Sequence, residues 1–203
     1  MTQSTPSLVP RVLSTDGLVL RPFVEADEPA VAEAFHDRGI LHWAVGRAVA
    51  GAPEAERAGM WLRLRILSWE TGSAAFAVTD ASDGTLLGSV GVRDVNRLPD
   101  QAVLGYWVTP KARGRGVATR ALDAASRWSF AAPEKGGLGL HRLSLDHALL
   151  NPASCRVATK AGFRLEGTMR DFYVDADGQR HDSHLHARLA TDRRPGAVTA
   201  AAP

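Results

Sequence analysis

A short glycine-containing turn carries the residues best suited to bind an anion. It spans residues 108–118, VTPKARGRGVA, and places two glycines and three cationic side chains between a predicted strand and a predicted helix. The first backbone N–H groups of a helix have no partner inside it, and glycines leave such donors unobstructed. The helix dipole favours negative charge at the same end. The turn therefore predicts a site for a pyrophosphate group.

Two other phosphate-binding loops do not fit this turn. A dinucleotide-binding fingerprint needs a third glycine where Thr119 stands, and it follows the first strand of a parallel unit, whereas this turn comes late in the chain. An ATP-type loop needs Gly-Lys-Ser or Gly-Lys-Thr, which is absent here. Taken alone, the turn could also be an ordinary helix start that binds no ligand.

The segment Asn151-Pro152-Ala153-Ser154 starts a second predicted helix directly after a strand. Asn at the cap and Pro at the first helical position are typical of a helix start and need no further function. A catalytic role for the Ser154 hydroxyl stays open beside that structural one. Cys155 follows, but no His and carboxylate frame it in the sequence, so we do not expect covalent catalysis.

Three histidines near the end of the chain have a loose metal-like spacing. On a strand, His184 and His186 would share one face, with His181 close by. No fourth ligand is evident in the sequence, so the three histidines are expected to be ordinary residues of a sheet. We therefore expect no metal. One of these histidines could still relay a proton through water.

The hydrophobic pattern predicts an α/β (α+β) fold in the order β-α-α-β-β-β-α-β-α-β-β. The expected strands span residues 18–23, 75–79, 86–95, 101–108, 141–148, 163–169 and 181–189. The expected helices span residues 27–36, 53–70, 116–130 and 152–161. We expect one domain over residues 16–190, with a flexible N-terminal segment over 1–15 and a flexible C-terminal tail over 191–203.

Composition narrows the class of protein. The 203 residues include 24 basic and 22 acidic side chains, with a net charge of +2 and a sequence pI of about 9.0. Only Lys111, Lys135 and Lys160 are lysines, and the codon bias of a GC-rich genome explains most of the arginines. The charge is too low for a broad nucleic-acid surface, and no apolar run suits a membrane span. With the single Cys155, these features lead us to expect a cytoplasmic protein without nucleic-acid or membrane partners.

Taken together, the motifs resemble the GCN5-related N-acetyltransferase (GNAT) family over residues 18–189, and most closely its RimJ/RimL branch. The turn has the spacing Arg113-x-x-Gly116-x-Ala118 of the coenzyme-A pyrophosphate motif in that family. The supporting segments are LRPF at 20–23, GYWV at 105–108, NxxS at 151–154, KAGF at 160–163, LEG at 165–167 and ARL at 187–189. The resemblance implies a single GNAT-like domain with a mixed, mostly antiparallel sheet flanked by helices.

The resemblance also implies acetyl transfer from acetyl-CoA to an amine. The backbone N–H at Val108 would stabilise the oxyanion, Asn151 would contact the pantetheine arm and Ser154 would protonate the leaving sulfur. The implied cofactor-binding residues are Val108, Arg113, Gly114, Arg115, Gly116, Val117, Ala118, Thr119, Asn151 and Ser154. The implied catalytic residues are Ser154, Val108 and Asp171.

The general base departs from the family pattern. Relatives often carry a glutamate in the strand before GYWV, yet residues 101–104 read QAVL. Asp171, beyond the LEG segment, is a candidate in its place. An α-amine with a pKa of about 7.8 is roughly a quarter neutral near pH 7.4, and a lysine amine with a pKa of about 10.4 only about a thousandth. A weak base therefore favours an N-terminal α-amine or another low-pKa amine as acceptor.

Several alternatives stay open at this point. The acceptor is a peptide N-terminus or a small molecule, including a polyamine or an aminoglycoside. The absent glutamate keeps open a catalytically inactive acyl-CoA-binding module, and the resemblance leaves a homodimer open. Trp43, Trp61 and Trp69 lie in the helices that cover the acceptor site in this family, where they would line the acceptor pocket or belong to the core.

Overall fold

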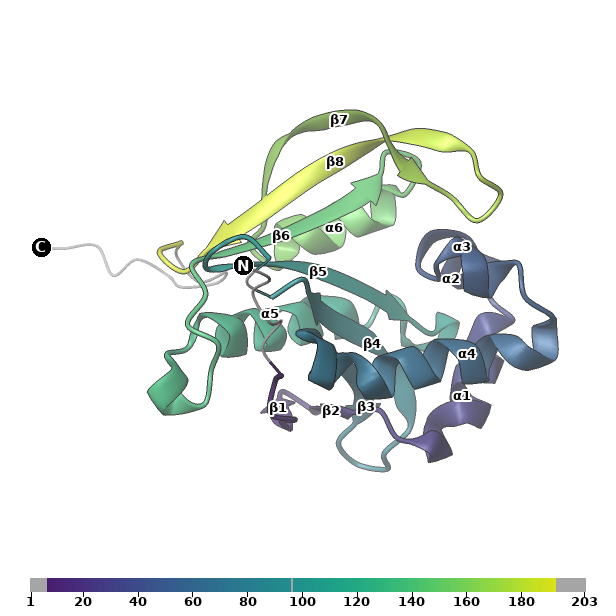
Figure 1. The fold of residues 1–203 in the computed structure, drawn as a ribbon, viewed down its shortest axis with the longest axis horizontal. Coiled ribbons are helices and arrows are strands. Elements are labelled where there is room, and N and C mark those ends of the chain that lie inside the picture. Colours follow the sequence, from purple (N-terminus) through teal and green to yellow (C-terminus); the bar gives the residue numbers. More distant parts are fainter. Residues whose placement is uncertain (1–6, 96, 193–203) are drawn as a thin grey trace, which may run out of the picture.

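An eight-stranded sheet runs through the molecule in the order β1-β2-β3-β4-β5-β6-β8-β7 (Figure 1). The computed structural model describes residues 7–95 and 97–192. The strands are β1 (Leu13–Thr15), β2 (Leu18–Pro22), β3 (Ala74–Asp80), β4 (Leu86–Arg93), β5 (Gln101–Val108), β6 (Arg142–Ala148), β7 (Arg164–Val174) and β8 (Arg180–Leu189). Every neighbouring pair is antiparallel except β5 and β6. This confirms the predicted mixed, mostly antiparallel sheet.

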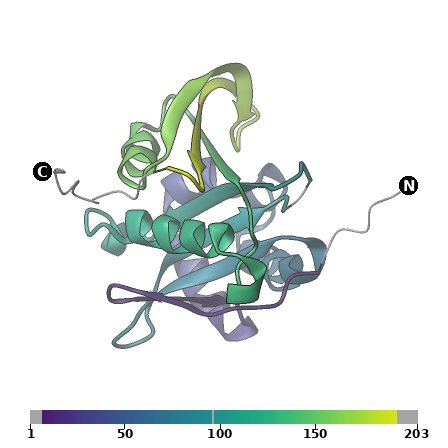
Figure 2. The same ribbon diagram turned by 90° about the vertical axis from the view of Figure 1, so that its left-hand side faces the viewer.

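Helices cover both faces of this sheet (Figures 1 and 2). They are α1 (Glu28–Phe35), α2 (Arg38–Trp43), α3 (Arg47–Ala50), α4 (Glu54–Ile66), α5 (Val117–Phe130) and α6 (Pro152–Lys160). Side chains alternate between the two faces along each strand. On β3, Phe76 therefore packs in the cluster beneath α5, while Ala75 and Ala77 pack against α1 and α4. No helix within the described residues is long and apolar enough to cross a membrane.

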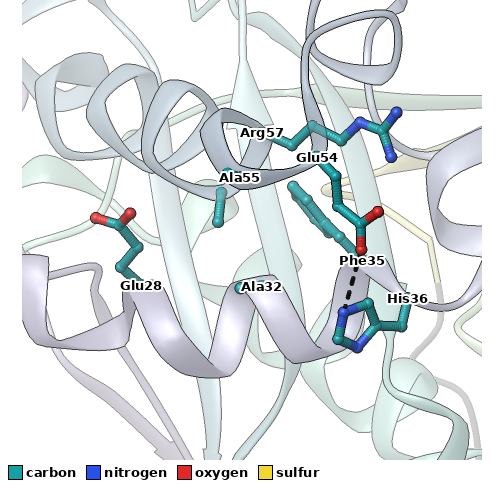
Figure 3. Close-up of a pocket in the computed structure, with 8 residues that line it drawn as sticks. Glu28, Ala32, Phe35, His36, Glu54, Ala55 and Arg57 are labelled. Carbon is teal, nitrogen blue, oxygen red and sulfur yellow. Dashed lines mark ion pairs between the residues drawn. The ribbon is translucent and has the colours of Figure 1, made fainter.

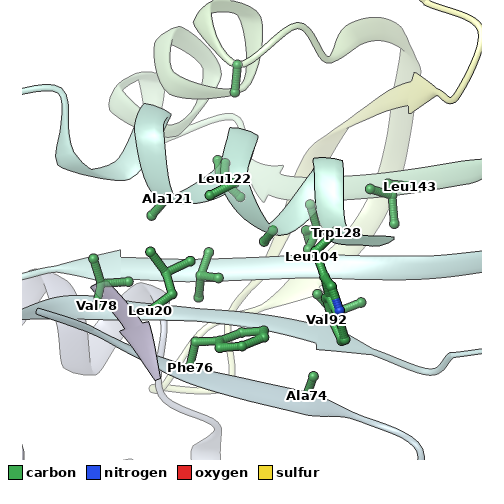
Figure 4. Packing of buried hydrophobic residues seen from close by; sticks show 14 of the residues in the cluster. Leu20, Ala74, Phe76, Val78, Val92, Leu104, Ala121, Leu122, Trp128 and Leu143 are labelled. Atoms are coloured by element: carbon green, nitrogen blue, oxygen red, sulfur yellow. The ribbon is translucent and has the colours of Figure 1, made fainter. Parts of the chain in front are cut away.

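The larger of two apolar cores lies between the sheet and α5 (Figure 4). Phe76, Leu104 and Leu122 are fully buried there, and Trp69 meets Phe76 edge-on with ring centroids 5.0 Å apart. In the second core, Trp61 contacts Phe23, Phe35 and Trp107. Trp61 and Trp69 are therefore core residues, which answers one of the questions left open by the sequence.

The first strand corrects the predicted N-terminal boundary. Residues 13–15, expected within the flexible segment over 1–15, form β1 and pair with β2. The N–H of Leu8 donates to the backbone oxygen of Trp69, so contacts with the folded domain begin before β1. Residues 1–6 and 193–203, the outermost parts of the two predicted flexible ends, lie outside the described residues.

Two short helices and several boundaries also differ from the predictions. The sequence did not predict α2 and α3, because segments of six and four residues are too short to show a helical period. The helix expected over 53–70 ends at Ile66 and continues as a 3-10 turn over Leu67–Thr71. Strand β7 is longer than expected and reaches Val174, so the β7–β8 hairpin extends toward α2 and α3 (Figure 1).

Candidate active site

A gap opens between β5 and β6, the one parallel pair in the described sheet. Their register pairs residues 101–103 with 142–144 and continues no further, although β5 runs to Val108 and β6 to Ala148. The strands therefore diverge toward their carboxyl ends. Backbone groups on the facing edge of β5 are left available to a ligand from Leu104 onward.

The backbone N–H of Val108 points into this gap. The N–H of Thr109 donates to Leu87 on β4 at 2.9 Å, so the odd-numbered residues of β5 bond toward β4. Because the direction alternates along a strand, the N–H groups of Tyr106 and Val108 face β6 instead. Val108 thus has the orientation expected of an oxyanion donor.

The turn over residues 108–118 depends on its two glycines for its backbone conformation. Gly114 and Gly116 have φ angles of 74° and 72°, in the left-handed region, and Gly116 is the N-cap of α5. No side chain caps the helix, and the N–H groups of Val117, Ala118 and Thr119 have no acceptor among the described residues. Several N–H donors therefore converge at the positive end of a helix.

The arginines of the turn are engaged by carboxylates. Arg113 makes a two-pronged ion pair with Asp37, the N-cap of α2, at 2.6 and 3.1 Å. This pairing lowers the pKa of Asp37. Arg115 lies 3.8 Å from Asp80. The side chain of Arg113 is therefore directed toward α2, and the anion site rests on backbone donors more than the sequence indicated.

Further cationic side chains lie along α5, from Arg120 in its first turn to Arg127 in its third, where Arg127 pairs with Asp123 at 3.3 Å. A cavity of about 360 Å³ is lined by Thr15, Asp16, Thr119, Arg120, Asp123, Arg127 and Lys160. Arg120 also donates to the backbone oxygen of Arg115 at 3.1 Å, which stabilises the turn. The sequence did not predict that Lys160 joins Thr119 and Arg127 at one cavity, because helix and strand packing brings these distant segments together.

Ser154 is 8% exposed at the first turn of α6, and its hydroxyl lies 2.9 Å from that of Tyr106 on β5. Burial raises the pKa of Tyr106 to about 12. The phenol therefore stays protonated near neutral pH and is able to donate to Ser154. Asn151 caps α6 by accepting from the Ser154 N–H at 3.3 Å, which fixes the position of Ser154.

Two carboxylates are candidates for the general base. Asp171 is exposed in an irregular part of β7, and the contacts that hold it involve its backbone: its N–H donates to Asp182 and its carbonyl accepts from Arg180. Asp146 lies on β6 in the diverging region, on the face opposite Leu145 and His147. Burial raises its pKa against the opposing charges of Arg93 and His147. The alternation of β6 could have revealed Asp146 in the sequence.

The histidines separate into two groups. His181 Nε2 donates to the Asp175 carboxylate at 2.6 Å, close to Trp43 near the hairpin end. His184 and His186 instead meet His147 and Cys155 on the other side of β8. Burial lowers the pKa of both His147 and His186.

The surroundings of Cys155 correct one expectation. The sequence showed no histidine beside its thiol, yet His186 Nε2 lies 3.8 Å from its Sγ. The cause is long-range strand pairing, which places β8 next to β6 and α6.

Trp43 is half-buried at the end of α2. Its backbone oxygen accepts from the hydroxyl of Tyr173 at 2.5 Å, and its ring lies 5.7 Å from that of Tyr173. This contact ties α2 to the β7–β8 hairpin, which lies beside α2 and α3 (Figure 1).

A separate cavity of about 420 Å³ lies between α1 and α4 (Figure 3). Glu28, His36, Glu54 and Arg57 line it, and His36 lies 3.5 Å from Glu54. None of its lining residues belongs to β5, β6 or α6, so it is separate from the gap that carries Val108 and Ser154.

A family model for the acetyltransferase (GNAT) domain matches residues 17–164. The chain belongs to the GNAT family. The [Ribosomal protein uS5]-alanine N-acetyltransferase of Escherichia coli (strain K12) is 29% identical over 197 residues, covering 94% of this chain and 97% of that protein. The ribosomal-protein-serine acetyltransferase of the same strain is 30% identical over 106 residues, covering 51% and 55%. Acetyl-CoA-dependent N-acetyl transfer and the likeness to the RimJ/RimL branch are thereby confirmed.

Solved structures agree on the fold of this GNAT protein. RimL, a ribosomal L7/L12 α-N-protein acetyltransferase in complex with coenzyme A, matches with a TM-score of 0.72 at 18% identity, covering 88% of this chain and 98% of that one. The converging N–H groups of the α5 turn and the gap beside Val108 are the features of this chain that suit acetyl-CoA.

Proposed function

We propose that this GNAT enzyme acetylates the N-terminal α-amine of a ribosomal protein in the cytoplasm. The observation that carries the proposal is the gap between β5 and β6, where the Val108 N–H faces the same space as the Tyr106–Ser154 pair. Support for the acceptor class comes from the uS5-alanine N-acetyltransferase, which aligns over nearly its whole length. Ribosomal proteins and acetyl-CoA share the cytoplasm, which supports that location.

Backbone donors of this chain would bind the coenzyme and the reacting carbonyl. The N–H groups at residues 114–119 would hold the pyrophosphate, with Arg120 in the first turn of α5 and Lys160 on the adjoining cavity supplying positive charge. The Val108 N–H would donate to the thioester oxygen as negative charge develops on it. Removing one such donor in other enzymes costs about 10²–10³ in kcat, so this single N–H matters.

Ser154 would donate a hydrogen bond to the departing sulfur. A phenol with a pKa of about 12, such as Tyr106, does not fully protonate a thiolate whose conjugate acid has a pKa near 8.5. We therefore infer that Tyr106 donates to Ser154 and that Ser154 donates to sulfur, and that this chain stabilises the thiolate. The proton that finally neutralises the thiolate is the one that the attacking amine gives up to its base, returned through solvent.

Asp146 would accept the proton of the attacking amine. It lies on the face of the sheet covered by α1 to α4. The Arg93 guanidinium lies over β5 there, since a Cβ built on Gly105 would come within 3.5 Å of Arg93 Nη2. A carboxylate with a raised pKa is a stronger base than an ordinary one. It is sufficient for an α-amine, which is already partly neutral, and weak for a lysine.

Thiol release from acetyl-CoA tests the proposed acceptor. Peptides beginning with Ala, Ser or Met and containing one internal lysine are expected to turn over, whereas the same peptides with a blocked N-terminus are not. Mass spectrometry would place the acetyl group on the α-amine. Turnover of spermidine or an aminoglycoside with no peptide turnover would contradict the acceptor class. Firm coenzyme binding without turnover of any amine would indicate a binding module.

A further inference from the structure

Four side chains able to bind a metal meet in the interior, outside the groups used for acetyl transfer. They are His147 on β6, Cys155 on α6, and His184 and His186 on β8. One ligand atom of each lies within 4.8 Å of those of all the others. The β6–β8 register places His147 opposite His184, and His186 two residues along on the same face. The three elements lie side by side in Figure 1.

Two separations between ligand atoms suit a tetrahedral ion. Nε2 of His147 lies 3.3 Å from Nε2 of His186, and Sγ of Cys155 lies 3.8 Å from the same His186 nitrogen. Zinc bonds of about 2.0–2.1 Å to nitrogen and about 2.3 Å to sulfur give ligand separations of about 3.3 Å and about 3.6 Å at the tetrahedral angle. The two distances therefore need to change by only about 0.2 Å or less.

The orientation of the rings supports ligation as well. His147 Nδ1 donates to the Ala148 carbonyl at 2.9 Å, which leaves the lone pair of Nε2 directed toward the cluster. His147 and His186 are 4% and 1% exposed. Nδ1 of His184 is buried without a hydrogen-bond partner in the described part of the chain. Buried polar nitrogens with unused capacity are costly unless a ligand satisfies them.

We propose that His147, Cys155, His184 and His186 bind a divalent transition-metal ion of the zinc class. Three nitrogen ligands and one sulfur ligand suit zinc, and four protein ligands leave no open coordination position, as in structural sites. The ion would tie the first turn of α6, which also carries Ser154, to β6 and β8. The expectation of no metal depended on a missing fourth ligand, and His147 and Cys155 complete the set.

Metal titrations of the chelator-treated, reduced protein test this site. We expect Zn²⁺ to bind at one ion per chain in competition with a chromophoric chelator. Co²⁺ should give the visible bands of a tetrahedral site and a thiolate charge-transfer band. Cys155→Ser should abolish the charge-transfer band and weaken Zn²⁺ binding at least tenfold. Zn²⁺ at a hundredfold excess over its Kd should raise Tm by about 5 °C or more.

A matched pair of variants on one strand supplies the control. Bound Zn²⁺ should protect the Cys155 thiol against alkylation. His184→Gln should weaken Zn²⁺ binding at least tenfold and remove this protection, whereas His181→Gln should change neither property. Cys155 and His184 are half-buried, so both variants are expected to keep the fold, which circular dichroism checks. Absence of saturable binding, or unchanged binding in Cys155→Ser and His184→Gln, would overturn the assignment. These readouts do not involve acetyl transfer, so they stand apart from the proposed function.

Discussion

The hydroxyls of Tyr106 and Ser154 lie 2.9 Å apart, although the two residues are 48 positions apart in the chain. Tyr106 belongs to the strand that ends at Val108, and Ser154 to the first turn of α6. Because burial keeps the phenol protonated, it can donate to Ser154 and leave the Ser154 proton for another acceptor. This bond therefore connects the proposed oxyanion donor strand with the proposed donor to sulfur.

Ser154→Ala is expected to lower kcat by about 10²-fold with coenzyme A affinity nearly unchanged, because the lost hydrogen bond forms mainly in the transition state. Steady-state thiol release and calorimetric titration measure the two quantities. Ser129→Ala is the control, since that buried hydroxyl donates to Ala125 within α5. A collapse of coenzyme affinity in Ser154→Ala would show that the role of Ser154 is architectural.

Tyr106→Phe should lower kcat about fivefold to tenfold, the effect of one hydrogen bond of about 1–1.4 kcal/mol. The effect should vanish in a Ser154→Ala background, since the phenol acts through the serine. A double-mutant cycle on kcat measures this coupling. Full additivity of the two substitutions would contradict the proposed chain of donors.

Gly116→Glu is expected to abolish measurable coenzyme A binding in calorimetry. Gly116 has a left-handed φ, and a carboxylate there would repel the pyrophosphate at the start of α5. Gly84→Glu is the matched control, because Gly84 also has a left-handed φ but lies in the β3–β4 turn. Equal binding by both variants would remove the assigned pyrophosphate site.

Local patterns were enough to predict most of the β5–turn–α5 unit. The alternation of residues 101–108, the two glycines and the amphipathic stripe of α5 each describe contacts within a few residues. The side-chain pairing of Arg113 was beyond such patterns, because its partner Asp37 lies 76 positions away in an unpredicted helix. The turn was therefore correctly placed, while the roles of its arginines depended on tertiary structure.

The cluster around His186 shows the same division on a larger scale. Strand alternation correctly put His184 and His186 on one face. That His147 and Cys155 join them follows from β8 pairing with β6 beneath α6, a topology that one sequence does not specify residue by residue. Asp146 was missed for a different reason, since its alternating pattern was visible and only its position in the diverging gap gave it a role.

Gly88→Ala tests the backbone donor at Val108, which no side-chain substitution can remove directly. A Cβ at position 88 would lie 2.3 Å from the Trp107 oxygen and 3.1 Å from Val108 Cα, so β5 would have to move. We expect kcat to fall at least tenfold, since a displacement of about 1 Å can cost about 10²-fold. Gly91→Ala on the same strand meets nothing closer than 3.9 Å and should keep near-normal kcat. Equal rates in both variants would contradict the role given to Val108.

Asp27→Asn should destabilise the fold by about 1–3 kcal/mol, a loss in Tm of about 2–10 °C. Asp27 is 6% exposed and accepts two hydrogen bonds from Arg21, at 2.7 and 2.8 Å, and one from the Val24 N–H at 2.9 Å. Burial alone would raise its pKa, but these bonds outweigh burial and lower it. The stabilisation is therefore present above the ordinary aspartate pKa and is lost as pH falls through the lowered one.

Thermal unfolding across acidic pH measures this effect. The Tm of the unaltered protein should decline toward low pH more steeply than that of Asp27→Asn. Glu25→Gln, an exposed change in the same 3-10 turn, should leave the pH profile unchanged. Parallel profiles for the unaltered protein and Asp27→Asn would show that the ion pair contributes no pH-dependent stability.

The pH dependence of kcat/KM distinguishes the two candidate bases, Asp146 and Asp171. A base must be ionised, and burial raises the pKa of Asp146, so activity should fall as pH drops through that raised pKa. Asp146→Asn should lower kcat/KM at least tenfold and remove this acid limb, leaving only the limb set by the amine substrate. Asp171→Asn should keep both the rate and the limb, because its carboxylate lies exposed on β7. Loss of the limb in Asp171→Asn instead would transfer the base to β7 and leave Asp146 as a buried partner of Arg93.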